Sequence, residues 1–176
     1  MSRVQVFVGA SLDGFIAGPK DELDWLGGSE GDTPDTFAPF FLTIGAVLMG
    51  RRTYDVVAGF ASGVWPYGDT PLRVATSRPL TPMRASVSAL SGSIQELVAK
   101  AKELAGDRDV YVDGGRLIRA TLDAGLVDAI TVTVVPMVLG EGIPLFAGVQ
   151  RRHPLKLIGQ RTVGDAGVEL RYEPQR

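Results

Sequence analysis

Residues 110–128 read VYVDGGRLIRATLDAGLVD and carry the clearest signal of the fold class. An alternating apolar run stops at Gly114 and Gly115, and a helix-like pattern begins at once with Arg116. Asp113 can cap that helix, so capping does not require the glycines. Two explanations fit them. One is a tight strand-to-helix connection with a positive φ at one glycine, and the other is the close approach of a ligand to the backbone.

Strands and helices alternate along the rest of the chain. The pattern predicts strands at residues 4–10, 46–49, 72–76, 86–90, 109–112 and 129–135. It predicts helices at 21–26, from Pro34 to Ile44, at 52–60, at 94–104 behind a capping box at 93–96, and after Gly115. Strands at 156–163 and 168–173 form a closing hairpin. This order predicts one α/β domain over residues 1–176, with a mostly parallel sheet.

The composition excludes several function classes. Of the 176 residues, 45% are hydrophobic and 22% charged, as is typical of globular proteins. The chain has no cysteine and one histidine, His153, so we expect no disulfide, thiol catalysis or metal site. A net charge of −2 gives no reason to expect nucleic acid or a membrane as partner. The absence of a signal peptide and of an apolar span of ~20 residues predicts a cytoplasmic protein.

Three segments place anion-binding chemistry at strand ends, where parallel sheets bind ligands. The first is Gly114-Gly115, at which the free N–H groups of a helix start attract anions. The second is MGRRTY at residues 49–54, where two arginines in a first helical turn oppose the helix dipole. A phosphate held by the Arg51 guanidinium and the Thr53 hydroxyl would remove this conflict, and so would arginines directed away into solvent.

The third segment is ATSRP at residues 75–79, a strand end followed by hydroxyl groups and a cation. Thr76, Ser77 and Arg78 suit a phosphate or the edge of a base, although Ser and Pro also favour ordinary turns. Together the three segments suit an elongated anionic dinucleotide, and the arginines suit one with an additional phosphate. NADPH is therefore the predicted cofactor.

The order of the motifs resembles that of the dihydrofolate-reductase-like proteins. The motifs are SLDGFIAG at 11–18, LDWL at 23–26, VLMGRRTYD at 47–55, ATSRP at 75–79, VDGGRLI at 112–118 and VVPMVLGEGIPLF at 134–146. They look closest to the branch that contains the riboflavin-biosynthesis reductase domain and its stand-alone relatives. The resemblance implies a three-layer α/β/α fold with about eight strands in a mostly parallel sheet, an antiparallel C-terminal hairpin, and NADPH along the carboxyl edge.

The resemblance also assigns roles by position. It implies that Gly50, Arg51 and Thr53 hold phosphates, with Arg51 near the 2′-phosphate. It implies that Thr76, Ser77 and Arg78 line the adenosine end, and that Gly114, Gly115 and Arg116 bind the pyrophosphate. In the same way, the nicotinamide would lie near Ala10, Asp13 and Ile16, and Thr131 or Thr133 would reach the substrate.

Acidic residues near the first helix are the candidates for the substrate side. Folate reductases carry an aspartate three residues before the tryptophan of this helix, and Glu22 holds that place relative to Trp25. The proton is expected to come from Glu22 or from water, Asp13 is a second catalytic candidate, and Asp24 is a predicted substrate ligand. Each also has a structural explanation, because acids are favoured at helix starts and Asp13 suits a turn. We expect His153 at the surface.

Two departures narrow the function. The stretch at residues 68–71, GDTP, lacks the arginine with which folate reductases bind the carboxylate tail of folate, which argues against a dedicated folate reductase. No histidine and cysteine pattern matches the ligands of a zinc deaminase, which excludes deaminase activity. We predict a homodimeric NADPH-dependent reductase that transfers hydride to a carbonyl or imine carbon of a small heterocyclic or ribosyl-derived substrate, as a 5-amino-6-(5-phosphoribosylamino)uracil reductase does. The alternatives are a dihydrofolate reductase, a nucleotide-binding module without turnover, or a site for a simple nucleotide or sugar phosphate.

Overall fold

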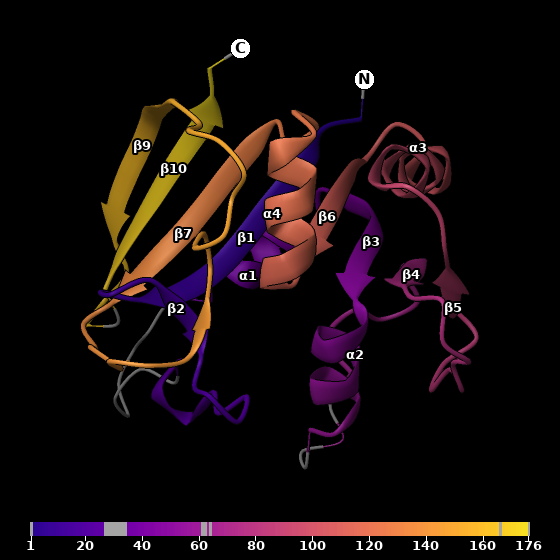
Figure 1. The fold of residues 1–176 in the computed structure, drawn as a ribbon, viewed down its shortest axis with the longest axis horizontal. Helices are drawn as coiled ribbons and strands as arrows, with labels where there is room; N and C mark the ends of the chain where they lie inside the picture. The colour runs from indigo at the N-terminus through magenta and orange to yellow at the C-terminus, as the bar shows by residue number, and fades with distance from the viewer. Residues whose placement is uncertain (1, 27–34, 61–62, 64, 166, 176) are drawn as a thin grey trace.

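An eight-stranded sheet with the strand order β5-β4-β3-β6-β1-β7-β10-β9 forms the centre of the computed structural model, which describes residues 2–26, 35–60, 63, 65–165 and 167–175 (Figure 1). The parallel strands are β1 (Val4–Ser11), β3 (Ile44–Gly50), β4 (Leu72–Ala75), β5 (Val87–Leu90), β6 (Asp109–Asp113) and β7 (Ala129–Val135). Antiparallel β10 (Val168–Pro174) and β9 (Leu155–Thr162) complete the β7 edge. The predicted mostly parallel sheet with a C-terminal hairpin is confirmed.

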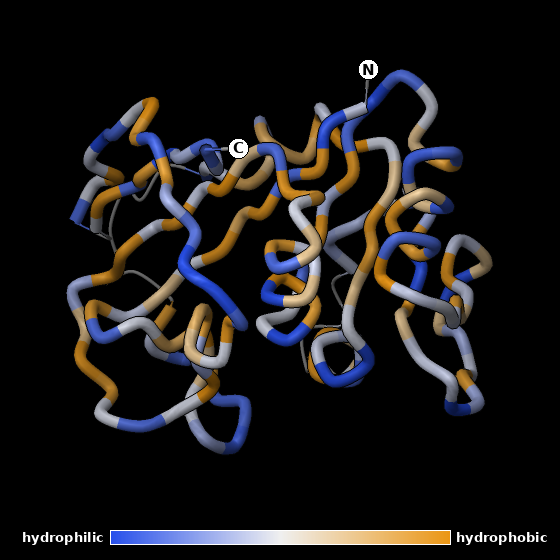
Figure 2. The backbone as a smooth tube through the Cα atoms, turned by 45° about the horizontal axis from the view of Figure 1, so that its top comes forward, coloured by the Kyte–Doolittle hydropathy of each residue, from blue (hydrophilic) through white to orange (hydrophobic). Residues whose placement is uncertain are grey.

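Two helix layers cover the sheet, because successive strand residues point to opposite faces. The helices α3 (Ile94–Ala105) and α4 (Gly115–Asp123) pack with Leu48 and Val112 on one face. The helices α1 (Phe37–Phe41) and α2 (Arg51–Ala58) pack with Met49 and Tyr111 on the other. Figure 2 shows the apolar positions concentrated in the strands and the hydrophilic ones in the connecting turns. Among the described residues, no helix combines the length and apolar character that crossing a bilayer requires.

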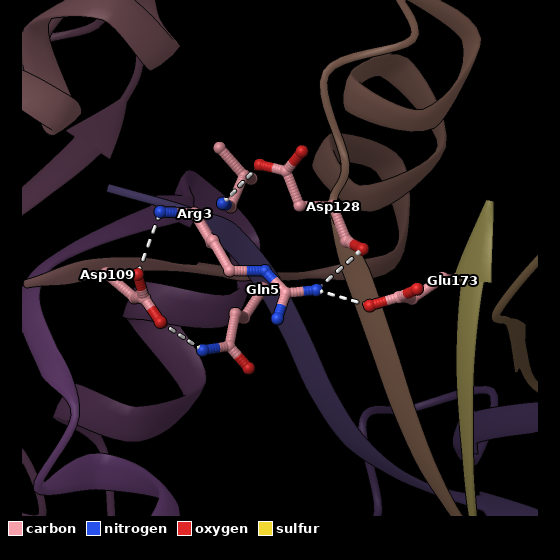
Figure 3. Close-up of polar contacts among 6 residues, drawn as sticks. Arg3, Gln5, Asp109, Asp128 and Glu173 are labelled. Atoms are coloured by element: carbon pink, nitrogen blue, oxygen red, sulfur yellow. Dashed lines mark hydrogen bonds and ion pairs between the residues drawn. The ribbon is translucent and has the colours of Figure 1, made fainter. Parts of the chain in front are cut away.

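A polar network joins the amino ends of the central strands (Figure 3). The backbone N–H of Arg3 donates to Asp109 at 2.8 Å, and its guanidinium donates to Glu173 at 2.8 Å. The carboxylate of Asp128 accepts the N–H of Val4 at 2.8 Å. These contacts tie β1 to β6, β7 and β10, so this end of the sheet has a structural role. The helix starts lie at the opposite, carboxyl end.

The structure corrects three local predictions. The helix expected up to Ile44 ends at Phe41, and Ile44 begins β3; Pro34 lies outside the described residues. Gly45, near the start of this strand, packs so closely against α3 that a side chain there would meet the backbone of Ala105. The helix expected at 21–26 is a single 3₁₀ turn at Asp24–Leu26, labelled η1. A short pair, β2 (Phe15–Ala17) with β8 (Ile143–Pro144), was not predicted.

His153 is also less exposed than its polar surroundings predict. Its side chain is 11% exposed, and Nε2 lies 2.7 Å from Oδ1 of Asp123 at the end of α4. The pair holds the segment before β9 against this helix. A long-range partner of this kind leaves no signal in the local sequence.

Candidate cofactor-binding and active site

A cavity of about 980 Å³ runs along the carboxyl edge of the sheet and reaches both helix layers. Small-molecule sites usually enclose about 300–1,000 Å³, so this cavity has room for a dinucleotide and a small second molecule. Eight of the residues predicted for the cofactor site line it: Ile16, Gly50, Arg51, Thr53, Arg78, Gly114, Gly115 and Arg116. The motifs at residues 49–54 and 113–116 therefore meet in one place. Arg78, from the motif at residues 75–79, lines the same cavity.

The strand-to-helix junctions at Gly50 and Gly114 touch each other, because β3 and β6 are neighbours. Gly114 has a φ of +100°, and a Cβ there would lie 2.5 Å from Oγ1 of Thr53. A Cβ on Gly115 would lie 2.9 Å from the carbonyl oxygen of Pro144. The tight connection proposed as one explanation of the double glycine therefore exists, and protein packing alone requires both glycines.

Gly50 differs from these two glycines. It precedes α2 with an ordinary extended backbone, and the nearest atom to a Cβ built there is 3.9 Å away, the carbonyl oxygen of Asp113. No neighbouring protein atom therefore requires a glycine at this position. The open space beside its backbone belongs to the cavity, next to the free N–H groups of the first turn of α2.

The two arginines that begin α2 are engaged by carboxylates. Nε of Arg51 lies 2.9 and 3.1 Å from the two oxygens of Asp55, and its Nη1 donates to the carbonyl of Pro79 at 2.9 Å. Nε of Arg52 donates to Asp21 at 2.7 Å. These contacts offset the conflict with the helix dipole without any phosphate. That Arg51 contacts the 2′-phosphate stays a prediction.

The remaining three arginines of the cavity wall behave differently from one another. Nη1 of Arg119 donates to the carbonyls of Pro144 at 2.6 Å and Leu145 at 3.2 Å, so this side chain fixes β8 against α4. Arg78 and Arg116 are exposed, and within the described ranges neither side chain has a hydrogen-bond or ion-pair partner. They are the two cations of the cavity wall whose charge is available to an anionic ligand.

The wall on the α1/α2 face is aromatic. The ring of Phe37 lies 6.0 Å from that of Phe7, 6.5 Å from that of Tyr67 and 6.1 Å from that of Tyr111, measured between centroids. Phe60, which follows α2, also lines the cavity. We call Phe7, Phe37, Phe60, Tyr67 and Tyr111 the aromatic wall. It can hold a flat ring by stacking and edge contacts.

Asp113 stands between the aromatic wall and the helix starts. It follows Tyr111 by two residues, so both side chains point to the α1/α2 face of the sheet. The N–H of Gly114 donates to its Oδ1 at 2.7 Å. Burial raises the pKa of this carboxyl to about 6, and the hydrogen bond from Gly114 opposes the rise only in part. Burial also raises the pKa of the Tyr67 and Tyr111 hydroxyls, and the charge of Asp113 raises both further.

Five of the other predicted residues do not line the cavity. Ala10 is buried among the residues that face α3 and α4, and Thr76 and Ser77 lie beside Arg78 but outside the lining. Thr131 and Thr133 pair with Phe7 and Gly9 across β1 and β7. Their register puts them on the same face as the aromatic wall, one strand away from the cavity.

The three predicted acids are exposed and also lie outside the cavity lining. Asp13 accepts hydrogen bonds from the Ser11 hydroxyl and from the N–H groups of Leu139 and Gly140 at 2.7, 3.1 and 2.7 Å. The carboxylate of Glu22 accepts the N–H of Lys20 at 2.8 Å, within the turn that precedes η1. Each contact stabilises a loop. Catalysis by Asp13 or Glu22, and substrate binding by Asp24, stay predictions.

Asp113 and the aromatic wall were missed by sequence reasoning. The aromatic residues are scattered through the sequence and form no local motif, and Asp113 was considered only as a possible helix cap. One signal for Asp113 was present, because it is a carboxylate that directly follows three buried strand residues, Val110, Tyr111 and Val112. No three histidine, cysteine or acidic side chains among the described residues gather in a group that could hold a metal ion.

Comparison with known proteins agrees with this architecture. Residues 2–168 match the RibD C-terminal domain. The chain belongs to this family. A relative, the uncharacterised protein YwjB of Bacillus subtilis, is 31% identical over 170 residues, 97% of each chain.

Two solved structures share the fold of this RibD C-terminal domain. A putative riboflavin biosynthesis protein from Shewanella is 28% identical, with 99% of both chains covered and a TM-score of 0.87. Dihydrofolate reductase from Enterococcus faecalis, complexed with NADP(H), is 16% identical, with 99% and 97% covered and a TM-score of 0.68. The second likeness concerns the fold alone. The predicted dihydrofolate-reductase-like fold and family branch are confirmed.

Proposed function

We propose that this RibD C-terminal domain is a reductase that takes NADPH and transfers hydride to a carbonyl or imine carbon of a small substrate. One observation supports the proposal best. Two glycine-capped helix starts share a cavity wall with two arginines, Arg78 and Arg116, whose charges have no partner among the described residues. Helix starts and free arginines bind phosphate groups through N–H donors and charge. A dinucleotide with several phosphates fits such a wall better than a neutral ligand does.

The residues present fit this cofactor. The backbone at Gly50 faces open space, so a phosphate can approach the N–H groups of α2 closely. Arg116 follows the first residue of α4, and Arg78 lies beside Pro79, the residue whose carbonyl is bound by Arg51. The two arginines therefore serve two different strand ends. This spread suits an elongated ligand with phosphates at separate positions.

NADPH supplies a hydride when it is bound, so the protein has to provide position and a proton. Asp113 is the side chain in the cavity wall best suited to hold that proton. Its pKa of about 6 lets the carboxyl keep a proton in neutral solution far more often than an exposed aspartate does. The aromatic wall beside it can orient a ring and exclude water.

NADPH binding and turnover test the proposal. We expect calorimetry to show NADPH binding about tenfold or more tighter than NADH, because only NADPH has a 2′-phosphate for a free arginine. Arg78→Ala and Arg116→Ala should each weaken NADPH binding, and added salt should weaken it further. Arg84→Ala, an exposed arginine outside the cavity wall, is the matched control.

Turnover is measured as loss of the reduced-nicotinamide absorbance with a panel of heterocyclic and ribosyl-derived substrates. NADPH binding without oxidation across the panel would point to a nucleotide-binding module. Equal affinity for NADPH, NADH and AMP would point to a simple nucleotide site and would overturn the cofactor assignment. If Asp113 supplies the proton, kcat/KM falls as the pH rises above about 6 in wild type and in Glu22→Gln, but not in Asp113→Asn.

A further inference from the structure

Two buried tyrosines flank Asp113 in the cavity wall. Tyr67 and Tyr111 are each 4% exposed, and both border the cavity. Burial, followed by the charge of Asp113, raises the pKa of both hydroxyl groups, so the carboxyl group of Asp113 lies close to both. The two hydroxyl groups therefore keep their protons at neutral pH and act as hydrogen-bond donors.

The two hydroxyl groups differ in their partners. The hydroxyl of Tyr111 donates to the carbonyl oxygen of Phe7 at 3.0 Å and so joins β6 to β1. In the part of the chain that the structure describes, the hydroxyl of Tyr67 has no hydrogen-bond partner. A buried donor without an acceptor is unfavourable, so an oxygen or nitrogen atom of a ligand in the cavity is a favourable partner for it.

Tyr67 is held in place by the loop before β4. Its carbonyl oxygen accepts the N–H of Thr70 at 3.1 Å, and Gly68 within this turn has a φ of +52°. Its ring lies 5.2 Å from that of Trp65 and 5.8 Å from that of Phe41, measured between centroids. The turn and the ring contacts restrict the movement of the hydroxyl group, as a preorganised donor requires.

The proposed reaction needs a donor of this kind. When hydride from NADPH adds to the carbon of a C=O or C=N bond, a C–H bond forms and the π electron pair moves to the oxygen or nitrogen, which reduces the substrate and leaves NADP⁺. That oxygen or nitrogen gains negative charge and takes a proton. In the proposed function the proton comes from Asp113, which is left as a carboxylate. A second donor fixed beside Asp113 stabilises the charge as it develops and keeps its own proton.

We propose that Tyr67 is a catalytic residue of this site, and that its hydroxyl group donates a hydrogen bond to the substrate oxygen or nitrogen that receives the proton of Asp113. This inference rests on the proposed function and adds a requirement to it. The substrate has to present one carbonyl oxygen or imine nitrogen to both side chains, with its ring against the other rings of the aromatic wall.

Stability in the absence of ligands tests whether the Tyr67 hydroxyl lacks a partner. Tyr67→Phe removes only this group, so we expect its denaturation midpoint to equal or exceed that of wild type. Tyr111→Phe loses the hydrogen bond to Phe7 and should unfold at a lower denaturant concentration. A marked loss of stability in Tyr67→Phe would show that its hydroxyl group has a partner within the protein, and would overturn the proposal.

A small probe tests the donor without turnover and without NADPH. Pyridine N-oxide is a flat, uncharged ring with a strong acceptor oxygen, and benzene is the matched ring without that oxygen. Binding is followed by NMR titration at about pH 5, where Asp113, with a pKa of about 6, keeps its proton. We expect Tyr67→Phe to bind pyridine N-oxide about fivefold more weakly than wild type does, and benzene equally well. Equal affinity of both proteins for the N-oxide, or no binding of it to wild type at millimolar concentration, overturns the proposal.

Turnover is the third measurement. With the fastest substrate of the panel, Tyr67→Phe should lower kcat by about 100-fold and leave the affinity for NADPH unchanged, because the lost hydrogen bond is made to the developing charge. Tyr172→Phe removes the hydroxyl of a tyrosine in β10 outside the cavity, and this matched control should keep the wild-type kcat. A kcat of Tyr67→Phe within about twofold of wild type contradicts a catalytic role.

The outcomes for Tyr67 and for the proposed function remain distinct. If NADPH does not bind, or is oxidised with no substrate of the panel, the reductase assignment fails and the catalytic role of Tyr67 fails with it, while stability and probe binding still show whether its hydroxyl group is a donor to ligands. If Tyr67→Phe oxidises NADPH at the wild-type rate, the reductase assignment holds and only the role of Tyr67 fails.

Discussion

The carboxyl group of Asp113 lies where its negative charge is costly. Its folded pKa of about 6 exceeds the ordinary value of 3.8, so ionisation destabilises the folded state. The stability associated with the protonated form is complete below pH 3.8 and is lost as the pH rises through about 6. The difference between the folded pKa of about 6 and the ordinary value of 3.8 corresponds to at most about 3 kcal/mol. Because the ionised carboxylate of Asp113 destabilises the fold at neutral pH, stability does not account for an aspartate at this position.

Asp113→Asn should therefore become more stable relative to wild type as the pH rises. The free energy of unfolding of Asp113→Asn minus that of wild type should increase by up to about 3 kcal/mol between about pH 4 and pH 8. The reason is that asparagine does not ionise. Urea denaturation across this range measures the difference. Asp107→Asn, at an exposed position outside the cavity, controls for the loss of one negative charge. A pH-independent difference for Asp113→Asn would show that its carboxyl is not buried as described.

Gly50 and Gly114 form a second test at the scale of single residues. Gly114→Ala forces a side chain into a positive-φ position and against Thr53, which we expect to cost about 1–3 kcal/mol of stability. In Gly50→Ala the new methyl group meets no neighbouring atom closer than ordinary contact distance. Alanine is a poorer helix N-cap than glycine, which lowers stability, but it also reduces the conformational entropy of the unfolded chain, which raises stability by a similar amount.

Gly50→Ala should therefore fold with nearly wild-type stability and yet bind NADPH about tenfold more weakly, because its methyl group projects into the cavity. Thermal unfolding and calorimetry of the two variants separate the roles of the glycines. Unchanged NADPH affinity in Gly50→Ala would mean that the cofactor does not approach the backbone at this helix start.

At the scale of elements, Asp13 joins the turn after β1 to the loop after β7. The hydrogen bond from the Ser11 hydroxyl, followed by that from the N–H of Gly140, lowers the pKa of the Asp13 carboxyl. A lowered folded pKa gives stability that is present above the ordinary value of 3.8 and is lost as the pH falls through the folded value.

Asp13→Ala should consequently be less stable than wild type at neutral pH, and the difference should shrink below about pH 4. Denaturation at both pH values measures it, and Asp69→Ala, another exposed acid, is the control. If kcat falls in Asp13→Ala while NADPH affinity and the neutral-pH stability stay at wild-type levels, Asp13 acts in catalysis and not as a loop cap.

At the scale of the whole molecule, β9 leaves an open edge on the sheet. Its backbone groups on the outer side have no neighbouring strand in the sheet of the described residues, and Leu157 and Ile158 are 49% and 40% exposed. An exposed apolar edge strand is a site where another chain can add. The predicted homodimer therefore has a candidate contact surface at β9.

We predict that the protein sediments as a dimer and that Ile158→Lys shifts it toward monomer. Lysine on an edge strand opposes pairing by charge and hydration. Analytical ultracentrifugation measures the change, and Leu42→Lys, at another exposed apolar position, is the matched control. A monomeric wild type, or a dimer that Ile158→Lys leaves intact, removes β9 as the contact surface.

The sequence by itself determined the order of strands and helices, the C-terminal hairpin and the segments that meet at the carboxyl edge. These features depend on local patterns: alternation in β1, the β-branched run of β7, the capping box before α3, and the glycines between strand and helix. The capping box is present, with the N–H of Glu96 donating to Ser93 at 3.3 Å. Each signal lies within a few residues, so it needs no knowledge of the rest of the fold.

Only the tertiary structure decided which charges are free and which side chains gather around Asp113. Arg51 is predicted to hold a phosphate, and the structure pairs it with Asp55; Arg52 is paired with Asp21, which is distant in sequence. The aromatic wall joins rings from positions 7 to 111, and burial next to it gives Asp113 its raised pKa. Desolvation and charge pairing depend on every element that packs around a group, and local sequence does not contain that information.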